Sequence, residues 1–269
     1  MYAVTRSSSR RVTYTFFGAE MSRNARFRAV VLRASKFGEI HKNVTLFGEG
    51  RGLVSAIAHG ANSRNGRLRA AVGQFTFGVC STYTDPVKNV EKITEFEVID
   101  HFSHVRDVLE RFWAASLWCE ILLKTYAGGE TEGIFRSFVD ALHEVTSAAP
   151  RDVRRITYQF LLRFLEDSGA LPDLAGCSSC GCRVRSGDGV VALTDAGEPV
   201  CGKCGGASRT IPAGAVAYLS HTRRMVFRDA VRVALDEQAA AGVRSYLFSL
   251  LETHVDAPLN TLKLGDGVV

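Results

Sequence analysis

The sequence predicts an α+β protein of several domains, in which a small β-barrel or sandwich precedes an all-helical domain that a four-cysteine module interrupts. Three observations predict this class. Strand-like runs fill residues 26–100, apolar residues recur with a helical period from residue 103 onward, and two Cys-x-x-Cys pairs enclose twenty residues. A chain of 269 residues is long enough for two or three domains. We expect these units: an arm at 1–21, the barrel at 22–101, helical parts at 102–173 and 209–269, and the cysteine module at 174–208.

The first residues differ in composition from the rest of the chain. Residues 1–19 carry three arginines and many Ser and Thr, but no acid and no apolar core of the kind that a secretory signal has. We interpret residues 1–21 as a disordered arm or as an extension upstream of a start at Met21. The composition also faintly resembles that of a transit peptide.

Five runs rich in Val, Leu and Phe predict the strands, and Gly-rich turns rather than helical segments separate them. The runs are FRAVVLRAS (27–35), HKNVTLFGEG (41–50), LVSAIAHGA (53–61), RLRAAVGQFTFGVCSTY (67–83) and VEKITEFEVID (90–100). GEGRG (48–52) predicts a hairpin turn rather than a phosphate loop, because no helix follows it. Gly73 and Gly78, inside the fourth run, predict bends or bulges where a barrel turns a corner.

The helical period is clearest in PRDVRRITYQFLLRFLEDSG (150–169), where apolar residues share one face and charged residues lie largely opposite. Pro150 suits the first turn of this helix and Gly169 suits its end. Residues 104–126 are apolar on most sides, which predicts a helix at the centre of a bundle. Further helices are expected at about 131–147, 212–221 and 237–253.

Five of the seven cysteines lie between residues 177 and 206. Two Cys-x-x-Cys turns present four thiolates, and a glycine after each pair permits the sharp turn. Zn²⁺ prefers four such ligands in a tetrahedron. The pattern therefore predicts one structural zinc ion, held by Cys177, Cys180, Cys201 and Cys204.

Cys182 is a fifth thiol beside this predicted site. It could replace Cys180 as a ligand, but the paired spacing favours Cys180. Four cysteines would close the coordination shell, whereas a catalytic zinc keeps a position open for water. We therefore interpret the module as a structural element rather than as a catalyst.

Other catalytic motifs are missing from the sequence. It contains no Walker A motif, no Gly-x-Gly-x-x-Gly after a strand, no Gly-x-Ser-x-Gly and no His-Glu-x-x-His. We expect no enzymatic activity. Cysteine usage favours the reducing cytosol, and no run of about 18 apolar residues predicts a membrane span.

Charge is distributed unevenly along the chain. Residues 1–80 contain thirteen Lys and Arg but three acids, a balance of +10, whereas the remainder has a balance of −5. A positive N-terminal third suggests a polyanionic partner, although a solvated basic surface is the plain alternative.

The segment AVVLRASKFGEIHKNVTLFGEGRGLVSAIAHGANSRNGRL (29–68) resembles the bacterial DNA repair protein RecO family. In it a strand ends in a basic residue, GE opens the second strand, GRGL makes a hairpin and AHGANS precedes an arginine-rich loop. The order of the predicted units is similar too, and the resemblance covers about residues 22–255. The extra arm and the few aromatic residues in the fourth strand depart from the family pattern.

This resemblance implies an OB-like barrel, an all-helical domain and a zinc ribbon, without an enzymatic cofactor. It implies binding of single- and double-stranded DNA, annealing of complementary strands without ATP, and cooperation with RecR in loading RecA. It also implies recognition of the acidic, apolar C-terminal tail of single-stranded DNA-binding protein, and a cytoplasmic, nucleoid-associated location.

OB folds bind strands through a basic groove and stacking aromatic side chains. The residues we expect to contact DNA are Arg33, Lys36, Lys42, Arg51, Arg64, Arg67 and Arg69, with Asn62, Ser63 and Asn65 as possible phosphate donors. Phe37 and Phe47 are candidates for stacking, but single aromatic residues on strands are more often core.

For the protein tail, the helical domain offers three large aromatic residues on one helix and three arginines at the start of another: Phe112, Trp113 and Trp118, and Arg151, Arg154 and Arg155. Individually, these aromatics are better interpreted as bundle core and the arginines as solvated. Two rival functions stay open: a zinc-ribbon scaffold of the RNA or transcription machinery that uses the barrel for RNA, and an enzyme with an unrecognised site.

Overall fold

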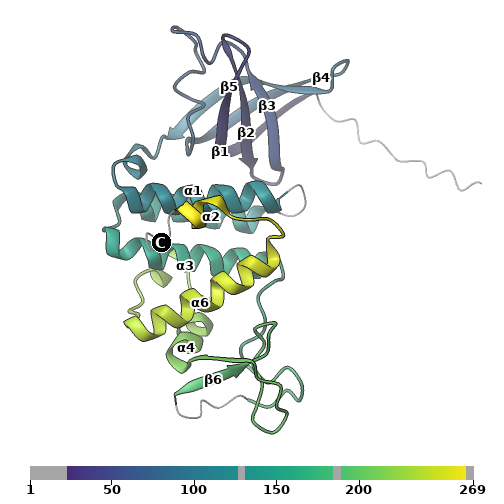
Figure 1. Cartoon of the computed structure of the whole chain (residues 1–269). Coiled ribbons are helices and arrows are strands. Elements are labelled where there is room, and N and C mark those ends of the chain that lie inside the picture. The colour runs from purple at the N-terminus through teal and green to yellow at the C-terminus, as the bar shows by residue number, and fades with distance from the viewer. Residues whose placement is uncertain (1–22, 127–130, 184–188, 265–269) are drawn as a thin grey trace, which may run out of the picture.

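The computed structural model describes residues 23–126, 131–183 and 189–264. A small β-barrel forms one end of the molecule, layers of helices follow, and a two-stranded module lies at the opposite end (Figure 1). The predicted arm at 1–21 falls outside the described residues. None of the described helices is long and apolar enough to cross a bilayer.

The N-terminal unit is a closed five-stranded barrel, which decides between the two predicted alternatives in favour of the barrel. Its strand order is β1-β2-β3-β5-β4. Only the β3–β5 pairing is parallel, and it is short. The strands are β1 (Asn24–Phe37), β2 (His41–Gly48), β3 (Gly52–Ala58), β4 (Phe77–Asp85) and β5 (Val90–Asp100).

The fourth predicted run is a strand only in its second half. Residues 59–76 form a series of turns, and Leu68 and Val72 from this segment join the barrel core. The sequence-based prediction of a strand from residue 67 was therefore wrong, because the apolar residues before β4 cover the barrel interior instead of pairing in its sheet. Gly73 lies in this turn segment.

Gly78 and the GEGRG turn behave as predicted. The β4–β5 register shifts at Phe77/Gly78, and a Cβ atom on Gly78 would lie 2.2 Å from the carbonyl oxygen of Glu97. Only glycine permits this close approach of two backbones. The turn between β2 and β3 places Gly50 and Gly52 at φ of +67°, in the left-handed region.

The helical part contains the predicted helices. They are α1 (Leu109–Thr125), α2 (Glu132–Ser147), α3 (Pro150–Asp167), α4 (Ala213–Thr222) and α6 (Glu237–His254). The 3-10 turn η1 (Ser103–Arg106) precedes α1, and the short helices α5 (Phe227–Ala230) and α7 (Asn260–Leu264) were not predicted. Helix α1 is the central helix that its apolar composition indicated, with Trp118 fully buried against Phe160 of α3.

One continuous core joins the barrel to the helices. Phe47 of β2 is fully buried, and its ring lies 5.6 Å, 6.0 Å and 6.4 Å from those of Tyr126, Phe135 and Phe138. The hydroxyl of Thr131 also donates to the carbonyl of Gly48. The core interpretation of Phe47 is confirmed, and its alternative role in base stacking is wrong.

The two-stranded module packs on α6. Strands β6 (Val190–Leu193) and β7 (Arg209–Pro212) pair antiparallel. The Tyr246 hydroxyl donates to the carbonyl of Gly197 at 3.0 Å, and Arg209 donates to the Ser249 hydroxyl at 2.7 Å. Gly197 has a φ of +80°, and a Cβ there would meet Leu250 at 3.1 Å. A single glycine therefore lets the module approach the helix.

Candidate metal centre and nucleic-acid interface

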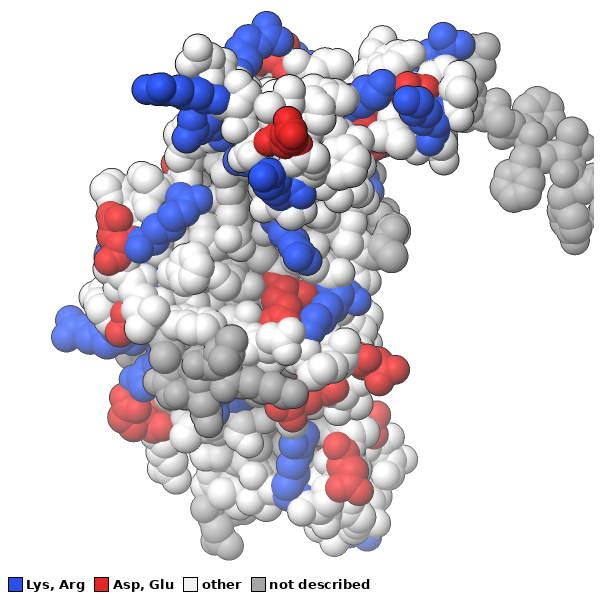
Figure 2. Space-filling view, turned by 45° about the horizontal axis from the view of Figure 1, so that its top comes forward, with Lys and Arg blue, Asp and Glu red and all other residues white. Residues whose placement is uncertain are grey.

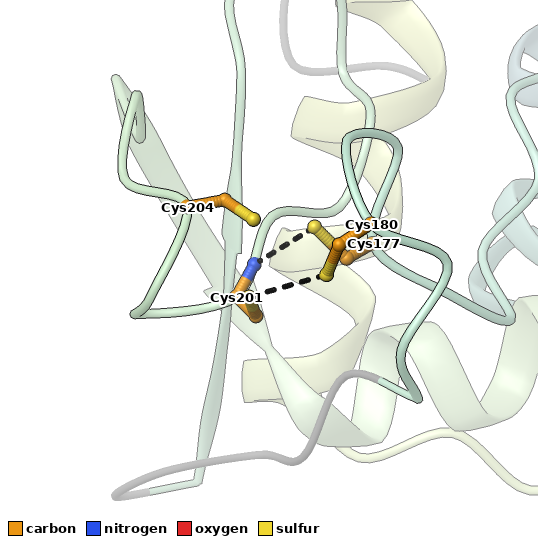
Figure 3. A group of neighbouring side chains, drawn as sticks. All are labelled: Cys177, Cys180, Cys201 and Cys204. Carbon is orange, nitrogen blue, oxygen red and sulfur yellow. Dashed lines mark hydrogen bonds between the residues drawn. The ribbon is translucent and has the colours of Figure 1, made fainter.

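Two facing turns bring together the sulfur atoms of Cys177, Cys180, Cys201 and Cys204, which all lie within 4.8 Å of one another (Figure 3). A tetrahedron with metal–sulfur bonds of about 2.3 Å separates its sulfurs by about 3.8 Å. The Cys180 and Cys201 sulfurs are 3.8 Å apart. The cluster therefore fits one tetrahedral metal ion, and all four of its donors are thiols.

Backbone N–H groups favour the thiolate form of Cys177 and Cys201, whereas the thiol of Cys180, followed by those of Cys201 and Cys177, raises the pKa of Cys204 to about 12. The amide of Cys201 donates to the Cys177 sulfur at 3.4 Å. This bond, followed by those from the amides of Cys180 and Ser179, lowers the pKa of Cys177 to about 6. The amides of Cys204 and Lys203 lower the pKa of Cys201 in the same way. Because metal ions bind thiolates, these hydrogen bonds favour the form of Cys177 and Cys201 that can act as a ligand.

Cys182 is outside the group of four sulfurs but close to it. Its side chain is exposed, and its carbonyl accepts a hydrogen bond of 2.8 Å from the Cys177 amide. The thiols of Cys180 and Cys201 raise the pKa of the Cys182 thiol to about 12. The structure thus groups Cys180 rather than Cys182 with the other three, as the spacing of the pairs favoured.

The second candidate site is the end of the barrel formed by the β1–β2 hairpin and the segment that follows β3. The backbone amide of Asn62 donates to the carbonyl oxygen of Ile40 at 2.8 Å. The side-chain amide of Asn62 donates to the carbonyl oxygen of Glu39 at 3.1 Å. The Gly60 amide donates to Nδ1 of His41 at 3.1 Å. These bonds hold the arginine-rich loop against the hairpin.

Five of the seven basic residues expected to contact DNA lie at this end. Lys36 and Lys42 are directly opposed on β1 and β2, and the loop carries the other three, Arg64, Arg67 and Arg69, all exposed. None of the five forms an ion pair with an acid within the described part of the chain. We call these five residues the basic tip.

The structure separates the other two residues from the basic tip. Arg33 is opposed to Thr45, so strand alternation directs it to the outer wall of the barrel. Arg51 lies in the β2–β3 turn, about 20 Å from Lys42 along six residues of strand. There it pairs with Glu91 at 2.8 Å and covers the ring of Phe27.

Exposed apolar side chains accompany the basic tip. Phe37 and Ile40 are both 49 % exposed at the β1–β2 hairpin. Phe37 is therefore available for stacking, and the core interpretation of this residue is wrong. Lys and Arg side chains are prominent over the barrel in Figure 2, whereas both signs of charge are mixed over the helices below.

Family comparisons match both halves of this architecture. The model of the N-terminal part of recombination protein O matches residues 21–102, and that of its C-terminal part matches residues 106–263. The chain belongs to the RecO family. The family resemblance noted from the barrel sequence is thereby confirmed.

Relatives in the RecO family extend over most of the chain. The DNA repair protein RecO of Desulforamulus reducens is 27% identical over 242 residues, which cover 88% of this chain and 92% of that protein. The protein of the same name from Anaeromyxobacter dehalogenans is 29% identical over 245 residues, with coverage of 89% and 94%. The basic tip thus falls in the RecO N-terminal match and the cysteine cluster in the C-terminal one.

In this RecO-family chain a pocket of about 270 Å³ opens between α2, α3 and the residues after α5. Ile156 and Val231 supply apolar surface, and the charged lining has both signs, with Arg155 and Arg232 facing Glu144 and Asp152. Arg155 pairs with Asp152 at 2.6 Å, whereas Arg232 has no acidic partner among the residues that the structure describes. We call this cavity the α3–α5 pocket.

The aromatic residues considered for tail binding do not form this pocket. Trp118 is fully buried, and Phe112 and Trp113 pack against the same core. The bundle-core interpretation of these aromatics is confirmed. Of the three arginines, Arg154 is paired with Glu237, and Arg155 alone lines the pocket. Sequence reasoning missed Arg232, although the arginine-rich run RRMVFRDAVR (223–232) could have indicated it.

Proposed function

We propose that this RecO-family chain is a non-enzymatic, DNA-binding recombination mediator of DNA repair. In this proposal it anneals complementary strands and helps RecR to load RecA onto single-stranded DNA coated by single-stranded DNA-binding protein. The observation that carries the proposal is the basic tip: five Lys and Arg side chains at one end of the barrel, without acidic partners in the described chain. The relatives' name, DNA repair protein, supports it.

The charges of the basic tip are suited to contacts with the phosphate backbone of DNA. Each phosphate that a Lys or Arg neutralises releases condensed counterions, which favours binding to any sequence. Phe37 can stack on a base without selecting it, because every base presents an aromatic face. The same neutralisation lowers the repulsion between two strands that approach each other. We therefore propose an OB-like role for the barrel, with single- and double-stranded DNA as ligands and no sequence preference.

We assign the metal to zinc and the cysteine module to a zinc ribbon. Four clustered thiols are the ligand set of structural zinc sites, and the β6–β7 hairpin follows the first pair of cysteines as in a ribbon. The zinc ion would cross-link the two Cys-x-x-Cys turns. The hydrogen bonds of Tyr246 with Gly197 and of Arg209 with Ser249 would then hold the cross-linked module against α6.

Strand annealing tests the proposed function directly. The protein, without nucleotide, should accelerate the pairing of two labelled complementary DNA strands, measured by fluorescence quenching as the labels meet. Non-complementary strands are the control and should give no signal. Absence of acceleration, together with tighter binding of RNA than of DNA, would favour the RNA-scaffold alternative instead.

We further propose that the α3–α5 pocket receives the C-terminal tail of single-stranded DNA-binding protein. Such a tail offers carboxylates and an apolar tip. Arg232, which has no acidic partner in the described chain, can pair with a carboxylate while Ile156 and Val231 receive the tip. The charged groups then stay paired as the apolar end loses water.

Charge reversal tests this pocket. The Arg232→Glu variant of the full-length protein should bind a labelled tail peptide roughly tenfold or more weakly, because a carboxylate would face the carboxylates of the tail. Arg224→Glu is the matched control, since Arg224 is an exposed arginine of the same segment outside the pocket lining. Titration monitored by fluorescence anisotropy measures both. Equal loss in the two variants would place the tail elsewhere.

A further inference from the structure

Two histidine rings lie in contact beside the basic tip. His41 is the first residue of β2, and His59 directly follows β3. Lys42 and Ala58 are paired across these strands, so the two histidines come next at the end of the ladder. Their ring centroids are 4.7 Å apart, and the angle between the ring planes is 78°. The arginine-rich loop therefore begins at an imidazole pair.

Strand register places an exposed aromatic ring next to this pair. Phe37 of β1 is directly opposed to His41, so their side chains lie on the same face of the sheet. Neighbouring strands lie about 4.8 Å apart, so His59 is about 10 Å from Phe37 across the sheet. A strand that stacks a base on Phe37 would bring a neighbouring phosphate to His59.

A hydrogen bond fixes His41 in one neutral form. The backbone amide of Gly60 donates to Nδ1 of His41 at 3.1 Å. Because an N–H group can only donate, Nδ1 carries no proton while this bond exists. Protonation of Nδ1 would set two N–H groups against each other and break a contact that holds the loop. His41 is therefore a positioning residue, and it is not the proton acceptor of the pair.

His59 has no such restriction. It is exposed, and no hydrogen bond to its ring is found in the described part of the chain. Partial burial, followed by the neighbouring His41 and then Lys92, lowers the pKa of His59. The unbound protein thus favours a neutral His59. A phosphate that arrives beside the ring would favour the imidazolium instead, because it supplies an opposite charge.

The charged groups around His59 leave this counter-charge to the ligand. Lys92 lies on β5 beside the end of β3 and is paired with Asp85 of β4 at 2.9 Å. Glu39, in the β1–β2 turn, is the other acid at this end, and no ion pair joins it to His59 among the described residues. The loop at 59–76 contains no acid. The remaining charges are those of the basic tip, and all of them are positive.

We propose that His59 is a proton-linked phosphate-binding residue of the DNA interface, which takes up a proton from solvent as a strand phosphate binds beside it. This inference rests on the DNA binding proposed above and adds a dependence on pH. Binding raises the pKa of His59 above its value in the unbound protein. Affinity for DNA therefore rises as the pH falls between the bound and the unbound pKa, and it is independent of this residue outside that range.

Titration of a labelled oligothymidylate with the full-length protein tests this link. Thymine bases stay uncharged over the range used, so the ligand itself does not titrate. At constant ionic strength, fluorescence anisotropy should show an affinity roughly tenfold higher at about pH 5.5 than at about pH 8. Calorimetry near neutral pH, in two buffers with different protonation enthalpies, should show a net uptake of protons on binding.

His59→Gln should lose both the proton uptake and the rise of affinity toward low pH. His104→Gln is the matched control, because His104 is an exposed histidine whose carbonyl accepts from Arg111 of α1, beside the helical domain. This control should keep both effects.

Unchanged proton uptake in His59→Gln, or its loss in His104→Gln, would overturn the inference. DNA binding by the wild type without proton uptake would overturn this inference alone. Absence of DNA binding at every pH would overturn the proposed function as well.

Discussion

Replacing Cys201 by Ser should release the metal ion and destabilise the helical domain that carries the cysteine module. Cys201 links the two turns, since its sulfur lies 3.8 Å from that of Cys180 and its amide donates to Cys177. Structural zinc binding is worth about 10–16 kcal/mol in isolated zinc-finger peptides, so loss of a ligand removes a large term. Metal analysis and thermal unfolding of the purified variant measure both effects.

Cys182→Ser provides the control for this experiment. The Cys182 sulfur is outside the group of four that lie within 4.8 Å of one another, so this variant should keep its zinc ion and its unfolding temperature. Complete loss of zinc from Cys182→Ser, with retention in Cys180→Ser, would show that the ligand set is different from the one we assign.

Replacing Arg64, Arg67 and Arg69 together should weaken binding of DNA of every sequence. Each phosphate contact contributes roughly 0.7 to 0.9 to the slope of log affinity against log salt, so three lost contacts should flatten that slope by about 2 to 3. At 0.15 M salt this corresponds to roughly a hundredfold loss of affinity. Fluorescence anisotropy with a labelled oligonucleotide across a salt series measures the affinity and the slope.

Arg51→Gln is the comparison for the triple variant. Arg51 was also expected to contact DNA, but it lies at the opposite end of the β2–β3 hairpin and is paired with Glu91. We expect a smaller change of slope from this variant than from any single replacement in the loop. If the triple variant kept both affinity and slope while Arg51→Gln lost them, the DNA interface would lie at the turn end of the barrel.

Patterns that depend on neighbouring residues in the sequence predicted most of the fold. Helical period located α3 and the central α1, and the glycines of GEGRG located the β2–β3 turn. The segment before β4 was misassigned because its apolar residues, such as Leu68 and Val72, have the composition of a strand while they cover the barrel interior. Periodicity reports that a residue is buried, but not which surface buries it.

Of the two candidate sites, one could be predicted from neighbouring residues in the sequence and the other could not. The cysteine cluster followed from spacing, because a Cys-x-x-Cys turn determines its own geometry. The basic tip could not be predicted from sequence spacing, because the contact of Asn62 with the β1–β2 hairpin brings its lysines and arginines together. Asn62 was interpreted as a phosphate donor, yet its side-chain amide is used in that contact. Strand register likewise separates Arg33 from Lys36, three residues away.

The burial of Phe47 against α2 and Tyr126, the residue after α1, has a consequence for synthesis on the ribosome. A nascent chain folds from its N-terminus as segments emerge. All five barrel strands emerge before Phe135 and Phe138, which cover Phe47. During this interval the newly paired barrel presents an uncovered apolar wall, to which chaperones or other nascent chains can bind. Slow translation between residues 100 and 140 would prolong this exposure, whereas rapid translation through α2 would shorten it.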